Sequence, residues 1–172
     1  EARVVITSSQ HRALIDEIRS FAPNVEQWLE AEDLPSETIT SERTYEFLEG
    51  AAMCYSSGTS GRPKGIVMSQ TKAPYGSSTP SEASLVTFMG LDDSMIYLSP
   101  APLYHTAPFM WTKSVLRYGG TIVIMEKFDA EECLQLIERH RPNLAQFVPT
   151  MFIRMLKLPA DVRGRYDVSS LK

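Results

Sequence analysis

The stretch Tyr55-Ser-Ser-Gly-Thr-Ser-Gly-Arg-Pro-Lys-Gly65 follows one short apolar run, residues 51–55, and leads into another at residues 66–68. Two apolar runs on either side of a glycine-rich loop predict a β-hairpin, because glycine accepts the positive φ angles that a tight tip needs. The loop also combines hydroxyl and basic side chains, which are groups that hold phosphate. We therefore expect a phosphate loop for a nucleotide, with ATP as the nucleotide.

Each residue type in this loop has a chemical use at a phosphate. Glycines let backbone N–H groups approach anionic oxygens, and hydroxyls rotate to donate hydrogen bonds. Pro63 stiffens the turn between two cations, Arg62 and Lys64. Serine, threonine and glycine also fill ordinary solvated loops, but the ordered combination favours phosphate. The residues that we assign to nucleotide binding are Ser56, Ser57, Gly58, Thr59, Ser60, Gly61 and Lys64.

The spacing of the loop excludes a P-loop NTPase. The Walker pattern reads Gly-x-x-x-x-Gly-Lys-Ser/Thr. Counted from Gly58, the second glycine position holds Pro63, and Lys64 is followed by Gly65 instead of serine or threonine. The loop therefore belongs to another class of phosphate site.

Strands and helices alternate along most of the chain. Capping boxes at Thr79/Glu82 and Asp129/Glu132, and a threonine cap at Thr150, mark helix starts. Alternating elements favour parallel neighbours, so we predict an α/β fold with a mostly parallel sheet and flanking helices. The expected strands are residues 4–7, 51–55, 66–68, 95–98, 121–125 and 144–148.

Helical spacing also predicts which residues each helix buries. In chain order they are Leu14, Ile15, Ile18 and Phe21; Leu85, Phe88 and Met89; Cys133, Leu136, Ile137 and His140; and Met151, Phe152, Met155 and Leu156. The cysteines, Cys54 and Cys133, lie far apart within apolar patterns, so we expect them reduced and buried.

Composition narrows the class of protein. The formal net charge of −4 over 172 residues argues against a nucleic-acid binder, which needs a basic surface. Neither a membrane-spanning apolar run nor a signal-peptide pattern is found. We therefore expect a cytoplasmic protein that is not transmembrane and binds no nucleic acid.

The loop carries a family resemblance. With its continuation Ile66-Val-Met-Ser69 it resembles the signature loop of the adenylate-forming superfamily, which includes acyl- and aryl-CoA ligases, luciferases and nonribosomal adenylation domains. A second block, Leu98-Ser-Pro-Ala-Pro-Leu-Tyr-His-Thr-Ala107, resembles the Pro-Leu-aromatic-His segment of the acid–CoA ligase branch. The resemblance spans residues 4–172, and its later portion is most similar to bacterial fatty-acyl-CoA synthetases.

This resemblance implies a ligase that joins a fatty or related carboxylic acid to the α-phosphate of ATP and passes the acyl group to coenzyme A. Magnesium accompanies the nucleotide, although no residue of this chain is assigned as a metal ligand. The loop and Lys64 would bind the β- and γ-phosphates. His105 matches a histidine near the junction of acyl pocket and pantetheine channel, and a purely structural role for it stays open. Met110 and Trp111 are candidates for an acyl tunnel or for plain core.

Departures from the family pattern limit this interpretation. Gln70 stands where many members have histidine, and the chain has neither a Gly-x-Thr-Glu motif nor a Gly-Asp pair. We interpret residues 1–172 as one partial N-terminal AMP-binding domain without the C-terminal domain, inactive alone. The alternative is a stand-alone nucleotide- or partner-binding module derived from the same fold. An uncovered sheet face also predicts self-association.

Overall fold

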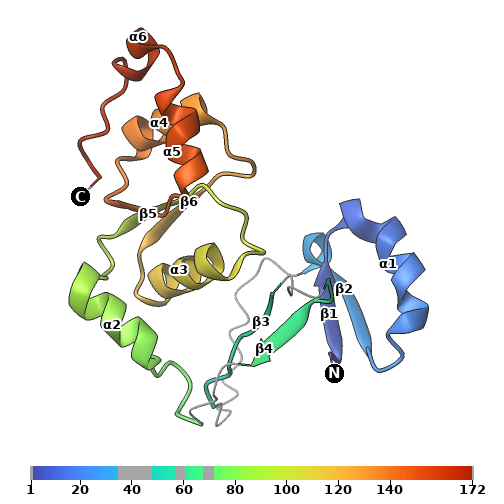
Figure 1. Cartoon of the computed structure of the whole chain (residues 1–172). Coiled ribbons are helices and arrows are strands. Elements are labelled where there is room, and N and C mark those ends of the chain that lie inside the picture. The colour runs from blue at the N-terminus through green and yellow to red at the C-terminus, as the bar shows by residue number, and fades with distance from the viewer. Residues whose placement is uncertain (1, 35–47, 57–60, 68–71, 172) are drawn as a thin grey trace. The chain divides into compact units, whose positions relative to one another are not determined.

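The computed structural model describes residues 2–34, 48–56, 61–67 and 72–171 (Figure 1). They belong to two compact units, Glu1–Tyr45 and Glu46–Lys172, and each unit is described by itself. Within the described residues, no helix has the length and apolar character needed to cross a membrane.

The first unit is a small parallel motif. β1 (Val4–Thr7) pairs with β2 (Gln27–Glu30), and α1 (Arg12–Ile18) lies between them in the chain. Of the apolar residues predicted to be buried here, only Ile15 is buried, whereas Phe21 is 84% exposed. A two-stranded sheet is too narrow to cover a wide apolar face, so that prediction is wrong for the flanking residues. The unit also holds the short 3-10 helices η1 (Ser9–His11), η2 (Arg19–Phe21) and η3 (Ala31–Asp33).

The second unit begins with the predicted hairpin. β3 (Met53–Ser56) and β4 (Lys64–Val67) are antiparallel, with Met53 opposite Val67 and Ser56 opposite Lys64. The strands that enter and leave the expected phosphate loop therefore pair directly with each other, as the sequence predicts.

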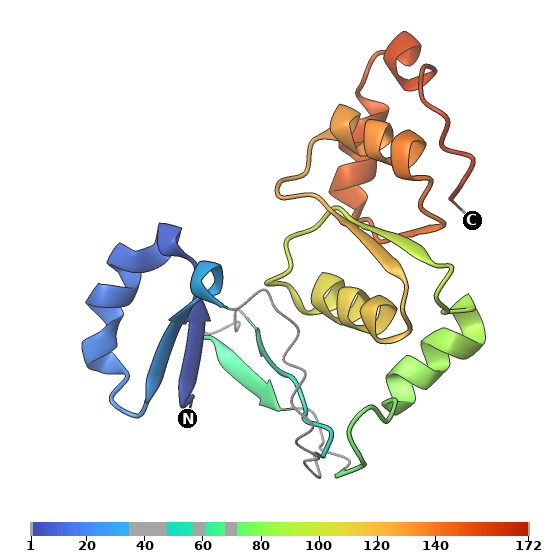
Figure 2. The same ribbon diagram turned by 180° about the vertical axis from the view of Figure 1, so that it is seen from behind.

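A three-stranded parallel sheet follows, in the order β6 (Thr121–Ile124), β5 (Ile96–Ser99), β7 (Leu144–Ala145). Figures 1 and 2 show α3 (Thr106–Arg117) on one face of this sheet, and α4 (Ala130–His140) and α5 (Pro149–Leu156) on the other. Side chains alternate along β5, so Tyr97 packs with α3 and Leu98 packs with α4 and α5. The predicted α/β fold is confirmed.

Local capping rules explain where helices begin. In α2 (Pro80–Met89), the Glu82 N–H donates to Thr79 Oγ1 (3.2 Å), and the Thr79 N–H donates to Glu82 Oε2 (2.8 Å). In α4, Asp129 accepts from two first-turn N–H groups. Thr150, however, is not a cap: Val148 holds that position and Pro149 begins α5, so Thr150 lies inside the first turn.

Some expected core residues are exposed. Phe88 of α2 is 81% exposed, and Phe152 of α5 is 50% exposed. On α2 the fully buried side chain is instead the charged Glu82, because α2 meets basic residues of α3. Cys133 is buried, Cys54 is half-buried, and both are free thiols. A further helix that the sequence does not predict, α6 (Ala160–Arg163), follows α5.

Candidate functional site

The described ends of the phosphate loop sit on the hairpin. Ser56 ends β3 directly opposite Lys64, which begins β4. Gly61 has a φ of +79°, and a Cβ there would meet nothing within 4 Å, so conformation and not space requires glycine. The loop residues assigned to phosphate from the sequence, Ser57, Gly58, Thr59 and Ser60, lie outside the described residues.

Two cations flank this turn. Arg62 and Lys64 are exposed, and neither has an ion-pair partner within the described parts of the unit. Two exposed cations at the same end of the hairpin can pair with an anion there.

A pocket lies between β3 and the start of α3. This hairpin pocket, of about 260 Å³, is lined by Met53, Cys54, Tyr55, Leu103, Tyr104, His105, Thr106 and Phe109. β3 supplies the first three residues, and the Pro-Leu-Tyr-His block with the first turn of α3 supplies the rest. The motif that begins at Tyr55 and the motif that contains His105 thus border one cavity.

The backbone at the start of α3 fixes the position of His105. His105 occupies the N-cap position, and its carbonyl accepts the Phe109 N–H at 3.2 Å. Its side chain makes no capping hydrogen bond, and the ring lies 4.5 Å, centroid to centroid, from the ring of Tyr104. The exposed imidazole is therefore left to line the pocket.

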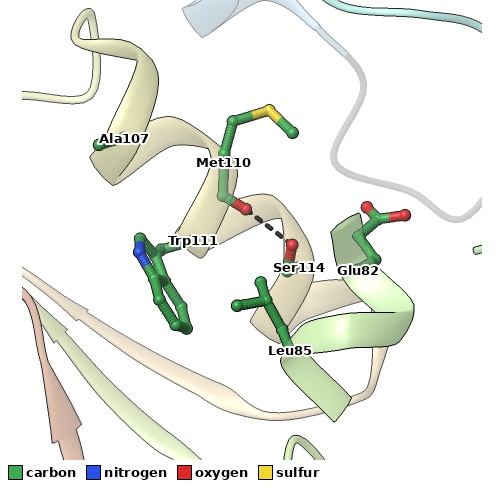
Figure 3. Close-up of a pocket in the computed structure, with 6 residues that line it drawn as sticks. All are labelled: Glu82, Leu85, Ala107, Met110, Trp111 and Ser114. Atoms are coloured by element: carbon green, nitrogen blue, oxygen red, sulfur yellow. Dashed lines mark hydrogen bonds between the residues drawn. The ribbon is translucent and has the colours of Figure 1, made fainter. Parts of the chain in front are cut away.

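A second cavity lies between α2 and α3. This helix pocket, of about 170 Å³, is lined by Glu82, Leu85, Ala107, Met110, Trp111 and Ser114. Figure 3 shows Leu85 pointing from α2 toward α3, where the Ser114 hydroxyl donates to the Met110 carbonyl at 2.8 Å. Both tunnel candidates line this pocket, but Trp111 also stacks on buried Tyr97 at 6.2 Å, so its ring is part of the core as well.

One of the residues that line the helix pocket, Glu82, carries a buried carboxylate. Glu82 Oε1 lies 3.2 Å from Lys113 Nζ and 3.3 Å from Arg117 Nε. Burial raises the pKa of Glu82, but hydrogen bonds from the Thr79 backbone and from Lys113 outweigh it, and the net pKa is lowered. Glu82 is therefore a charged carboxylate at neutral pH.

The ion pairs around Arg117 escape the sequence interpretation altogether. Arg117 pairs with Glu49 and with Glu82, and both carboxylates are buried. The sequence offers only a partial signal: Lys113 and Arg117 are spaced four apart on α3, which puts two cations on one helix face but does not indicate which carboxylates they meet. Within the described ranges, no cluster of three or more Asp, Glu, His or Cys residues is arranged to hold a metal.

Comparison with known proteins places this hairpin and sheet in a family. The sequence matches the AMP-binding enzyme family over residues 1–172. The chain belongs to that family. It is 30% identical to 4-coumarate–CoA ligase 3 of Arabidopsis thaliana, over 99% of this chain and 32% of that enzyme. It is 35% identical to 2-succinylbenzoate–CoA ligase of Bacillus pumilus, over 67% of this chain and 23% of that enzyme.

Solved structures agree on the fold of this AMP-binding chain. The inhibitor-bound N-terminal domain of FACL13 from Mycobacterium tuberculosis aligns with a TM-score of 0.78 and 25% identity, over 99% of this chain and 43% of that one. ATP-bound MatB from Rhodopseudomonas palustris aligns with a TM-score of 0.65 and 22% identity, over 94% of this chain and 33% of that one. The chain spans less than half the length of each of these relatives. Both sequence relatives are named as CoA ligases.

Proposed function

We propose that this AMP-binding chain carries the phosphate loop and part of the acyl pocket of an AMP-forming, ATP-dependent acid–CoA ligase. The observation that supports this most directly is the hairpin pocket, where the phosphate-loop strand and His105 border one cavity. Because the relatives are ligases, this proposal is favoured over a stand-alone binding module.

In the proposed reaction a carboxylate oxygen attacks the α-phosphorus of ATP, and pyrophosphate leaves. The thiol of coenzyme A then attacks the acyl carbon, and AMP leaves. Lys64 and the loop residues from Ser56 to Gly61 would hold the β- and γ-phosphates and stabilise the charge that develops as pyrophosphate departs. Magnesium would enter with the nucleotide. His105 would shape the place where the thiol of coenzyme A reaches the acyl group.

The acid itself is part of the proposal. The relatives' names include 4-coumarate and 2-succinylbenzoate, so the family takes more than one kind of acid. We propose a fatty or related carboxylic acid, because the helix pocket is mostly apolar and includes Leu85, Met110 and Trp111. A hydrocarbon tail suits such a lining better than a charged group does.

The remaining proposals concern the chain as a piece. Adenylation by this family draws on motifs that these 172 residues do not contain, so we propose that the chain alone is inactive. Exposed apolar side chains such as Ile6, Val67 and Phe88 favour self-association, which light scattering at rising concentration would detect. We propose a cytoplasmic location for the whole protein.

The decisive experiment is acid-dependent ATP–pyrophosphate exchange by the full-length protein that contains this chain, across a panel of fatty and aromatic acids. Lys64→Met should lower exchange about a hundredfold, the range seen when one transition-state donor is lost. The matched control is Lys127→Met, at an exposed lysine outside both pockets, which should leave exchange unchanged. No exchange with any acid, or equal rates for the two variants, would overturn the proposal.

A further inference from the structure

The segments on either side of the hairpin pair with each other and form its stem. We define the stem as residues 48–50 and 73–77. The Glu49 N–H donates to the Ala73 carbonyl at 2.8 Å, and Leu48 and Pro74 form an antiparallel bridge. The stem therefore pairs the segment that leads into β3 with a segment that follows β4 in the chain.

One side chain of α3, Arg117, contacts both segments of this stem. The Arg117 guanidinium donates to both carboxylate oxygens of Glu49, through Nη2 and through Nη1. Nη1 also lies 3.4 Å from the Ser77 carbonyl, on the other strand of the stem. Glu49 in turn accepts the Gly76 N–H at 3.0 Å. Arg117 thus contacts both the segment that enters the hairpin and the segment that leaves it.

The third nitrogen of the same guanidinium, Nε, contacts a carboxylate of α2. Arg117 Nε lies 3.3 Å from Glu82 Oε1, which Lys113 also contacts. The side chains of Glu49 and Glu82 are 8% and 1% exposed, so their charges have little access to water. Removing Arg117 would leave buried Glu49 without a cationic partner among the described residues and buried Glu82 with Lys113 as its remaining cation, which is costly for either carboxylate.

We propose that Arg117 is a positioning residue, which holds the stem of the phosphate hairpin at a fixed place on α3. The same helix begins right after His105, on the far wall of the hairpin pocket. Arg117 therefore sets how the phosphate strand faces His105. Its effect on ATP rests on the function proposed above.

A merely stabilising ion pair and a positioning residue differ in what they change. Loss of a merely stabilising ion pair lowers the melting temperature alone. Loss of a positioning residue also changes KM for ATP in protein that is still folded. The variants are Arg117→Met, which removes the guanidinium, and Arg117→Lys, which retains charge but reaches only one carboxylate at a time. The control is Arg141→Met, which breaks the exposed Arg141–Asp167 pair (2.8 Å) elsewhere in the same unit.

The readouts are KM and kcat for ATP in the exchange assay of the full-length protein, and hydrogen exchange of the stem amides without ATP. We expect Arg117→Met to raise KM about tenfold or more with a smaller effect on kcat, because misplaced phosphate contacts weaken binding. Arg117→Lys should recover part of this loss. Stem amides should exchange faster in Arg117→Met, while Arg141→Met matches the wild type in both readouts.

Each remaining outcome has a stated meaning. Equal KM for ATP and equal hydrogen exchange of the stem amides in Arg117→Met and Arg141→Met would overturn the proposal. If Arg117→Met does not fold, Glu49→Gln replaces it, because that change keeps the Arg117–Glu82 pair and should still speed stem exchange. If the wild type shows no acid-dependent ATP–pyrophosphate exchange, the proposed function fails and the effect of Arg117 on ATP falls with it. Faster hydrogen exchange of the stem amides in Arg117→Met would then support only its hold on the stem, and unchanged hydrogen exchange would overturn that as well.

Discussion

Among single residues, Gly61 allows the sharpest test of the phosphate loop. Its φ of +79° is strained for any residue with a Cβ, although the space around it is open. Gly61→Ala should therefore lower the free energy of unfolding by about 1 kcal/mol through backbone strain, and weaken ATP binding. Urea denaturation and nucleotide titration measure the two effects.

The matched control for that test is Gly50. It also has open space around it, and it has no positive φ. Gly50→Ala should leave both measurements unchanged. Equal losses in the two variants would mean that the left-handed conformation of Gly61 has no part in the loss.

The sequence predicts the role of a residue best when the residues that act together are adjacent in the chain. The hydroxyls, glycines and lysine of the loop are adjacent in the chain, so their pattern predicts a phosphate site. Glu49 and Arg117 are 68 residues apart, and nothing in either neighbourhood indicates that they meet. A site role for His105 stays a prediction from its motif, and its place across a cavity from β3 required the structure.

Among the elements, the turn from α3 to β6 depends on Gly120. A Cβ there would lie 2.7 Å from Val115 Cγ1 and 2.8 Å from the Met95 carbonyl oxygen. The backbone oxygen belongs to the residue that precedes β5, so it cannot shift without disturbing the sheet. Gly120→Ala should cost about 2 kcal/mol or more of unfolding free energy, as overpacking does.

Gly164, just after α6, is the comparison for Gly120. It has no positive φ, and the nearest atom to an added Cβ would lie 3.3 Å away. Gly164→Ala should change the melting temperature little. If calorimetry gives both alanine variants the same melting temperature, the close approach at Gly120 is not limiting.

The elements themselves were mostly predictable, because their signals are local. The Thr79 capping box and the hairpin both follow from short motifs. Burial was less predictable, because it depends on the partner. α2 faces Lys113 and Arg117, so its buried residue is Glu82, while apolar Phe88 faces solvent. Strand β2 lacks a clear alternation and was missed.

For the molecule as a whole, the buried carboxylates predict a loss of stability in acid. The pKa values of Glu49 and Glu82 are lowered from the ordinary 4.5, so the unfolded chain binds protons more readily than the folded one below that pH. Their stabilisation is complete above the ordinary glutamate pKa and is lost as pH falls through the folded values.

The test compares unfolding free energies near neutral pH and in acid. Glu82→Gln should be less stable than wild type near neutral pH, and its stability should fall less between about pH 5 and about pH 3. The control Glu126→Gln, at an exposed acid, should follow the wild-type curve. An unchanged slope for Glu82→Gln would contradict the assignment of Glu82 as a buried, charged carboxylate.

The β3–β4 hairpin has a consequence for the affinity of the nucleotide site proposed above. Every residue of β4 is exposed, and an isolated two-stranded ribbon is marginally stable in water. For any ribbon that has its binding geometry only in a fraction of molecules, the apparent dissociation constant is the intrinsic one divided by that fraction. Affinity can then be tuned by substitutions that touch no phosphate, because they change how often the ribbon is assembled.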